Sequence, residues 1–191
     1  MKPIGILTLA AAFSLVLGGA ANALTFNVGA GPDVSPDDTA AAAYCVKTNG
    51  VVQTRDAAFD TNGSNPLILA GVRRFCQYTS KKGSQINLLI GTLYTRKPSL
   101  AALAYYAMVP PGTCQGNPAS CYCSLLGGSD LFGGINAAGG GWILPSNPTD
   151  VLEACMFPDQ SSIDSFGLFY HSAGIIRGRD LSKVLRYKNS R

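Results

Sequence analysis

Six cysteines constrain this chain more than any other feature, and four of them form two pairs with nearly the same spacing. The first cysteine of each pair stands in a similar motif: YCVKTNG, which begins at position 44, and YCSLLGG, which begins at position 122. The second cysteine follows 31 positions after the first in one pair and 32 positions after it in the other. The likeness continues, since SQINLLIGTLY ends at Tyr94 and SSIDSFGLFY ends at Tyr170. Farther on, two sets share one spacing: Leu100, Leu103, Tyr106 and Leu181, Val184, Tyr187. Ordered matches of this kind predict an internal duplication.

Each half is predicted to open with a helix that carries the first cysteine of its pair. In the first half, Ser35 is the expected N-cap and the helix closes at the Asn49-Gly50 turn. In the second half, Asn117 is the expected N-cap, a proline occupies the first helical position, and Gly127 ends the helix in a left-handed conformation.

The segments after these helices predict short strands and then further helices. Alternating apolar residues in NPLILAGVRRFCQY and GGGWILPSNPTDVLEACMF are typical of strands. Two helices are then expected in each half. Ser84 and Ser99 start them in the first half, and Ser161 and Asp180 start them in the second. The sequence therefore predicts an α+β protein of two related, disulfide-stapled modules, with a divergent first module over 24–110 and a second over 111–191.

The amino terminus has the pattern of a secretory signal. Residues 1–23, MKPIGILTLAAAFSLVLGGAANA, combine a lysine, an apolar run and a small-x-small end. The apolar run is shorter than the roughly 20 residues that span a bilayer. We therefore expect cleavage near Ala23 and export to the periplasm or the medium, where an even number of cysteines forms disulfides rather than a metal site.

The helix of the second module restricts the disulfide pairing. Cys121 and Cys123 are two positions apart, so a helix directs them to nearly opposite faces. Cys123 repeats the position of Cys45, whereas Cys121 and Cys114 have no counterparts in the first half. Of the 15 possible connectivities, the duplication selects one: Cys45 with Cys76, Cys123 with Cys155, and Cys114 with Cys121.

Charge is weak overall and concentrated at the carboxyl end. A formal net charge of +4 is too mild to indicate nucleic acid. The basic tail is a candidate contact with an anionic membrane surface, as an amphipathic helix. The alternative is that the helix packs its apolar side on the module and leaves its charges in solvent. The candidate contact residues of the tail are Arg177, Arg179, Lys183, Arg186 and Lys188.

Trp142 is the single tryptophan and lies in a glycine-rich segment, 129–150, that we expect to be a loop. This makes it a candidate contact residue for a partner, with the core as its alternative location. On the contact hypothesis, Trp142→Ala would abolish partner capture and leave the thermal stability nearly unchanged.

No catalytic constellation is expected. A triad would use His171, the only histidine, with Asp164 or Asp180, yet no nucleophile elbow accompanies it. Asp159 and Asp164, with Glu153, have the residue types for glycoside cleavage. A turn at Asp159 and a helix cap at Asp164 are the simpler interpretation. We therefore predict no enzyme, no metal and no cofactor.

The stretches NPASCYCSLLGG and CMFPDQSSIDSFGLFY resemble a family of small bacterial exported domains of unknown function whose members are named hemolysins. The likeness spans Asn117 to Tyr170 and implies export and a fold rather than an activity. The first half is at best a divergent copy, because it lacks the residues that match Phe157-Pro158-Asp159. The matching residues are Asn117, Pro118, Ala119, Ser120, Tyr122, Cys123, Gly127, Gly128, Cys155, Phe157, Pro158 and Asp159.

These features favour an exported, non-enzymatic binding module with an unknown partner in the bacterial envelope or medium. The first alternative is a membrane-active protein that uses the basic tail, and the second is a hydrolase that uses His171.

Overall fold

The computed structural model describes residues 36–130 and 139–189. They belong to one compact unit, Pro32–Arg191. The predicted signal peptide, 1–23, lies outside the described residues. Within the described part of the chain, no helix is long and apolar enough to cross a membrane.

Both halves of the unit contain helices and strands in a similar order. The first half holds α1 (Pro36–Lys47), β1 (Val51–Phe59), β2 (Leu67–Thr79), β3 (Gln85–Leu89), α2 (Ile90–Tyr94) and α3 (Leu100–Ala107). The second half holds α4 (Pro118–Leu125), β4 (Gly140–Leu144), β5 (Asn147–Leu152), β6 (Ala154–Met156), β7 (Ser162–Asp164), α5 (Ser165–Ser172) and the 3₁₀ turn η1 (Leu181–Lys183). The α+β prediction is confirmed.

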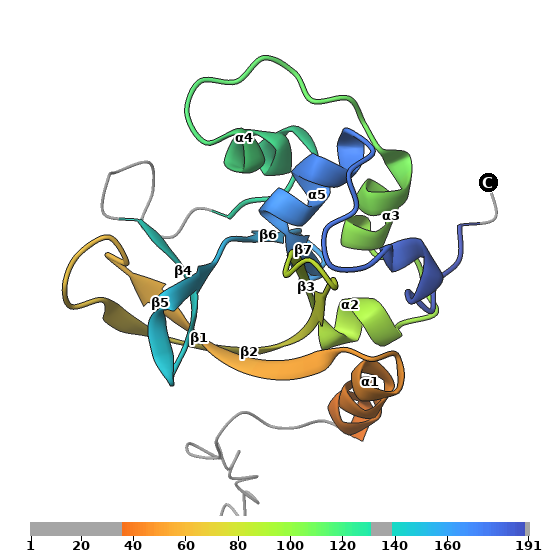
Figure 1. The fold of residues 1–191 in the computed structure, drawn as a ribbon, viewed down its shortest axis with the longest axis horizontal. Helices are drawn as coiled ribbons and strands as arrows, with labels where there is room; N and C mark the ends of the chain where they lie inside the picture. Colours follow the sequence, from red (N-terminus) through yellow and green to blue (C-terminus); the bar gives the residue numbers. More distant parts are fainter. Residues whose placement is uncertain (1–35, 131–138, 190–191) are drawn as a thin grey trace, which may run out of the picture. The chain divides into compact units, whose positions relative to one another are not determined.

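The strands of both halves form one antiparallel sheet in the order β5-β4-β1-β2-β3-β7-β6. β1 of the first half pairs with β4 of the second, and β3 pairs with β7. Only Glu153 separates β5 from β6, so the two ends of this order are consecutive in the chain. The sheet therefore curls around until its ends meet (Figure 1).

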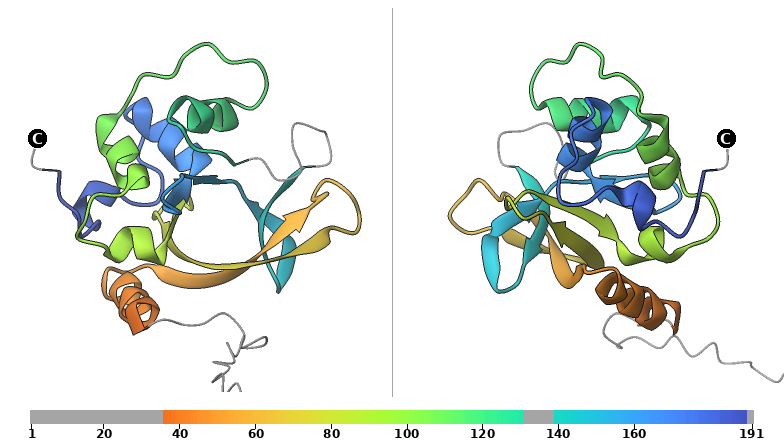
Figure 2. Two further views of the ribbon diagram at one scale, coloured as in Figure 1. Left: turned by 180° about the vertical axis from the view of Figure 1, so that it is seen from behind. Right: turned by 45° about the vertical axis from the view of Figure 1, so that its right-hand side comes forward.

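The curled sheet has two different faces. Residues directly opposite each other in neighbouring strands share a face. On one face, Cys76 lies opposite Leu88, Leu88 opposite Ile163, and Ile163 opposite Cys155. These four residues belong to the larger core, which also contains residues of the helices. This is the outer face, and α3, α4 and α5 gather on one side of it (Figure 2). The inner face, around which the sheet curls, holds a smaller core of strand residues only.

The three disulfides join the pairs expected from the sequence: Cys45–Cys76, Cys114–Cys121 and Cys123–Cys155. The first and third are fully buried in the outer core. Each lies directly against the glycine that follows its helix. A Cβ built on Gly50 would approach the Sγ of Cys45 to 2.8 Å, and one on Gly128 would approach the Sγ of Cys123 to 3.0 Å. A side chain at either glycine would therefore collide with the disulfide.

Several predicted helix caps are confirmed, whereas Ser35, the expected N-cap of the first helix, lies outside the described residues. The side chain of Asn117 accepts hydrogen bonds from the N–H groups of Ala119 and Ser120, and Gly127 has a φ of 82° just after α4. Ser99 caps α3 and Asp180 caps η1.

Two predicted helices are wrong in part. The residues after Ser84 and Ser161 first form β3 and β7, and helices α2 and α5 follow them. The sheet takes these residues because Leu88 pairs with Ile163, a contact that joins the two halves and has no local sequence signal. The carboxyl-terminal segment forms a single 3₁₀ turn rather than an amphipathic helix.

Candidate functional site

The inner face of the sheet divides into an apolar part and a polar part. The apolar part contains Trp142, which is 6% exposed and packs against Phe75 with ring centroids 5.7 Å apart. The prediction of Trp142 as an exposed contact residue is therefore wrong. It belongs to β4, where Ala57 and Leu152 flank it in the neighbouring strands. Cross-strand packing that the sequence did not reveal places it in the core.

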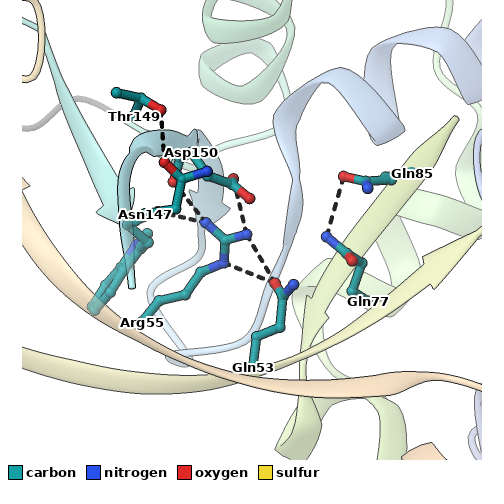
Figure 3. Close-up of polar contacts among 8 residues, drawn as sticks. Gln53, Arg55, Gln77, Gln85, Asn147, Thr149 and Asp150 are labelled. Atoms are coloured by element: carbon teal, nitrogen blue, oxygen red, sulfur yellow. Dashed lines mark hydrogen bonds and ion pairs between the residues drawn. The ribbon is translucent and has the colours of Figure 1, made fainter. Parts of the chain in front are cut away.

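The polar part is organised by Arg55 on β1, which is 1% exposed (Figure 3). Its Nε and Nη2 donate to Oε1 of Gln53, at 3.0 and 2.8 Å, and Nη2 also donates to Oδ1 of Asp150 at 3.0 Å. Nη1 donates to the carbonyl oxygens of Trp142 and Asp150, both at 3.0 Å. Every guanidinium nitrogen has a partner, so Arg55 has a structural role: it holds β4 and β5 against β1.

A hollow of about 160 Å³ lies beside this network. It is reached at the end where β3, β7 and α5 meet the turn between β5 and β6. Its polar lining comprises Gln85, Asn87, Asp150, Glu153, Asp164 and Arg177, and Phe166 adds an aromatic ring.

The carboxyl groups of the hollow are held in unusual surroundings. Asp164 is 6% exposed and accepts a hydrogen bond from the N–H of Gly167 at 2.9 Å. Burial raises its pKa, although hydrogen bonds from Gly167 and Asn87 and the charge of Arg177 act in the opposite direction. Burial also raises the pKa of Glu153, whose Oε2 accepts from Asn117 at 2.9 Å. The hollow thus gathers acceptors that water solvates poorly.

A second, larger groove of about 570 Å³ runs along the middle of β2. β2 contributes Val72, Arg73 and Arg74 to its lining, and α1 contributes Asp38. The rest of the lining comes from α2 and its flanking residues, the start of α3 and the turn at 159–161. Asp159, in that turn, accepts hydrogen bonds from the N–H groups of Leu100 and Ser161 at 2.8 and 3.1 Å. Its carboxylate is therefore occupied with holding that turn and the start of α3 together.

The groove borders an unpaired strand edge. Residues 75–79 of β2 pair with β3 on one side, and residues 67–77 pair with β1 on the other. Within the described residues, the stretch 67–74 thus has a partner on the β1 side only. The stretch begins with exposed apolar side chains, of which Leu67 is 60% and Ile68 53% exposed. Such an edge presents free backbone donors and acceptors to solvent.

The predicted basic contact residues are dispersed rather than gathered on one helix face. The guanidinium carbon of Arg177 lies 5.4 Å from the ring centroid of Tyr170, and that of Arg179 lies 5.7 Å from Tyr78. Arg186 lies over Tyr94 at 4.0 Å. Lys183 and Lys188 are exposed, near Asp180 and the carbonyl oxygen of Ser182 respectively. Each of the three arginines therefore lies over a tyrosine ring, and for Arg179 and Arg186 that tyrosine is distant in sequence.

The residues considered for catalysis do not assemble into a triad. His171 stacks on Tyr105 with ring centroids 3.7 Å apart, and burial lowers its pKa. Asp180 accepts hydrogen bonds from Tyr105 and Ser182 rather than from His171. Asp159 is a turn residue and Asp164 caps α5. Within the described part of the chain, no group of three metal-ligating side chains is found.

Sequence reasoning missed both the polar hollow and the groove. Gln77 and Asn87 alternate with apolar residues along β2 and β3, which could have indicated a polar inner face. Comparisons of this chain with protein-family models, with curated proteins and with solved structures found no match.

Proposed function

We propose that this chain is an exported, non-enzymatic binding module that recognises an extended segment of another polypeptide along the unpaired half of β2. The observation that carries the proposal is the one-sided pairing of residues 67–74 beside a groove of about 570 Å³. Three disulfides are compatible with an oxidising location outside the cytosol.

The backbone of β2 provides the first part of the recognition. β3 occupies this edge only as far as the pair Phe75 and Leu89, because the chain then turns into α2 at Ile90. An added peptide strand would take the position that β3 leaves empty. Main-chain hydrogen bonds supply affinity in this mode of binding, and alternate side chains of the peptide supply specificity.

The side chains of the groove provide the second part. No hydrogen bond or ion pair from another described residue is found for the guanidinium groups of Arg73 and Arg74. The groove also contains two carboxyl groups, but Asp159 accepts from Leu100 and Ser161, and Asp38 has an interaction of its own. The two arginines therefore favour a peptide with acidic side chains. The exposed Leu67 and Ile68 extend the same edge with apolar surface, so the expected ligand combines acidic and apolar residues.

Selection from a library of linear peptides tests this proposal. We expect enrichment of sequences that combine acidic and apolar residues, and we expect bound peptide to slow hydrogen exchange at backbone amides within residues 67–74.

Substitutions in the peptide and in the groove test the two parts of the recognition. Methylation of a peptide backbone nitrogen should abolish binding when it is placed at every second residue and not at the residues between, because alternate N–H groups of a strand face its neighbour. The double charge reversal Arg73→Glu and Arg74→Glu should weaken binding about 10- to 100-fold, the range for two charge-assisted contacts.

The matched control reverses two lysines outside the groove. Lys81 and Lys82 lie exposed in the turn between β2 and β3, so Lys81→Glu with Lys82→Glu changes the net charge equally without touching the groove. Equal losses in the two double variants, or protection from exchange away from residues 67–74, would contradict the proposed site. Release of dye from anionic vesicles by the protein would instead favour the membrane-active alternative.

We also propose that the chain arose by internal duplication. Each half contains a helix, a disulfide from that helix to a strand, and a glycine packed against the disulfide. Corresponding tyrosines also behave alike: the hydroxyl of Tyr44 donates to the carbonyl of Val184 at 2.9 Å, and that of Tyr122 donates to Val109 at 2.7 Å.

Equivalent positions should then respond equally to substitution. Gly50→Ala and Gly128→Ala each place a methyl group against a buried disulfide, and each should lower the free energy of unfolding by about 1–3 kcal/mol through overpacking. Urea unfolding of the oxidised variants measures this. Gly91→Ala is the control, because a Cβ there meets nothing within 4 Å. A large effect at only one of the two glycines would argue against their equivalence.

A further inference from the structure

The hollow beside Arg55 contains a buried acceptor without a partner. Asn87 is 4% exposed and lines the hollow, and its Oδ1 has no hydrogen-bond partner among the described residues. Buried side-chain oxygens in folded proteins are nearly always hydrogen-bonded. A bound water or a ligand would supply the donor at this position.

Two carboxyl groups beside Asn87 specify the kind of donor. Glu153 uses Oε2 for Asn117, and no described residue donates to its Oε1. Asp164 accepts hydrogen bonds from the N–H of Gly167, through Oδ1, and from the side chain and backbone of Asn87. An ammonium group carries three donors and a positive charge, so it matches one amide oxygen and two carboxyl groups better than a neutral hydroxyl does.

Arg177 adds a cation to the lining of the hollow. It is close enough to lower the pKa of Asp164, yet the ion pairs found in the described part of the chain do not include it. Its guanidinium instead lies over the ring of Tyr170. A planar guanidinium in this position presents donors for a carboxylate.

An apolar depression continues from the hollow. Phe166 and Arg177 line both, and the depression, of about 530 Å³, is completed by Tyr170 and Ile175. Ile175 is 52% exposed, so this surface has apolar area available for contact. Polar and apolar subsites therefore meet at Arg177.

From this arrangement we propose that the hollow and the depression together bind a free amino acid with an apolar side chain. The ammonium group contacts Asn87, Glu153 and Asp164, the carboxylate contacts Arg177, and the side chain lies against Phe166, Tyr170 and Ile175. This site is separate from the peptide groove on β2, and its test does not depend on that groove.

Titration calorimetry of the purified, oxidised protein with three probes tests the proposal. L-leucine has both charged groups, L-leucinamide keeps the ammonium group only, and N-acetyl-L-leucine keeps the carboxylate only. We expect L-leucine to bind at least about 10-fold more tightly than either analogue, since each analogue loses one charge-assisted contact. The analogues also distinguish a free amino acid from the amino or carboxyl end of a peptide.

Variants connect each charged group of the probe to one side of the hollow. Arg177→Gln should weaken L-leucine about 10-fold and leave L-leucinamide unchanged. Glu153→Gln, which keeps a hydrogen-bond acceptor for Asn117, should weaken L-leucine and L-leucinamide but not N-acetyl-L-leucine. Arg179→Gln is the matched control, because Arg179 lies over Tyr78 outside the hollow.

The proposal is overturned if L-leucine gives no binding at millimolar concentration. It is also overturned if L-leucinamide binds as tightly as L-leucine and Arg177→Gln has no effect. In that case only an ammonium group would be recognised, as at the amino end of a peptide.

Discussion

Trp142→Ala is expected to lower the free energy of unfolding by about 3–5 kcal/mol, the range for truncating a large buried aromatic side chain. Trp142 is 6% exposed and contacts Phe75 inside the curled sheet. Its neighbours Ala57 and Ala154 are too small to fill the space that the indole leaves. Because hydrogen-bonded neighbours hold β4 on both sides, its backbone has little freedom to collapse into the cavity.

Urea unfolding of the oxidised protein, followed by circular dichroism, measures this loss. Trp142→Phe should cost less, because a ring remains against Phe75. Leu67→Ala is the matched control, since Leu67 is 60% exposed on β2. If Trp142→Ala unfolds at the same urea concentration as the wild type, the indole does not belong to the inner core and its interpretation as a contact residue returns.

Arg55→Ala is expected to lower the free energy of unfolding by about 3 kcal/mol. Breaking a buried ion pair costs about 3–5 kcal/mol. The lower end applies here, because the Asp150 side chain is 35% exposed and water can solvate it. Gln53 and the carbonyl of Trp142 also lose their donors.

Arg73→Ala is the matched control for Arg55→Ala. Arg73 lies directly opposite Arg55 in the neighbouring strand, and it is exposed. Urea unfolding should therefore show a loss for Arg55→Ala that is several times larger than the loss for Arg73→Ala. Arg55→Met tests the origin of the effect, since it keeps most of the volume and removes only the hydrogen bonds. Equal stabilities of the Arg55 and Arg73 alanine variants would mean that Arg55 does not hold β4 and β5 on β1.

Short-range features of the fold were accessible from the sequence because their physical causes are local. Asn117 caps α4 through its own side chain, and Gly127 ends that helix because it tolerates a positive φ. The expected disulfide pairs also appear in the structure. They were inferred from the repeated positions of the cysteines and from the helix geometry that separates Cys121 from Cys123.

Contacts between distant strands were not accessible in this way. The pairs of Ala57 with Trp142 and of Leu88 with Ile163 depend on strand register, and register carries no signal in one strand alone. The first residues of the expected helix after Ser161 became β7, because sheet pairing overrides local preference.

The sequence by itself therefore determined the caps of α3, α4 and η1 and the α+β class, since these follow from the conformational preferences of nearby residues. It also determined the cysteine pairs, through the repeated spacing of the cysteines. Only the tertiary structure decided which side chains meet inside the curled sheet. Arg55 joins Asp150, and Asn87 meets Glu153 and Asp164, through the closure of strands from both halves into one sheet. The unpaired edge of β2 has the same origin, because it depends on where β3 leaves the sheet for α2.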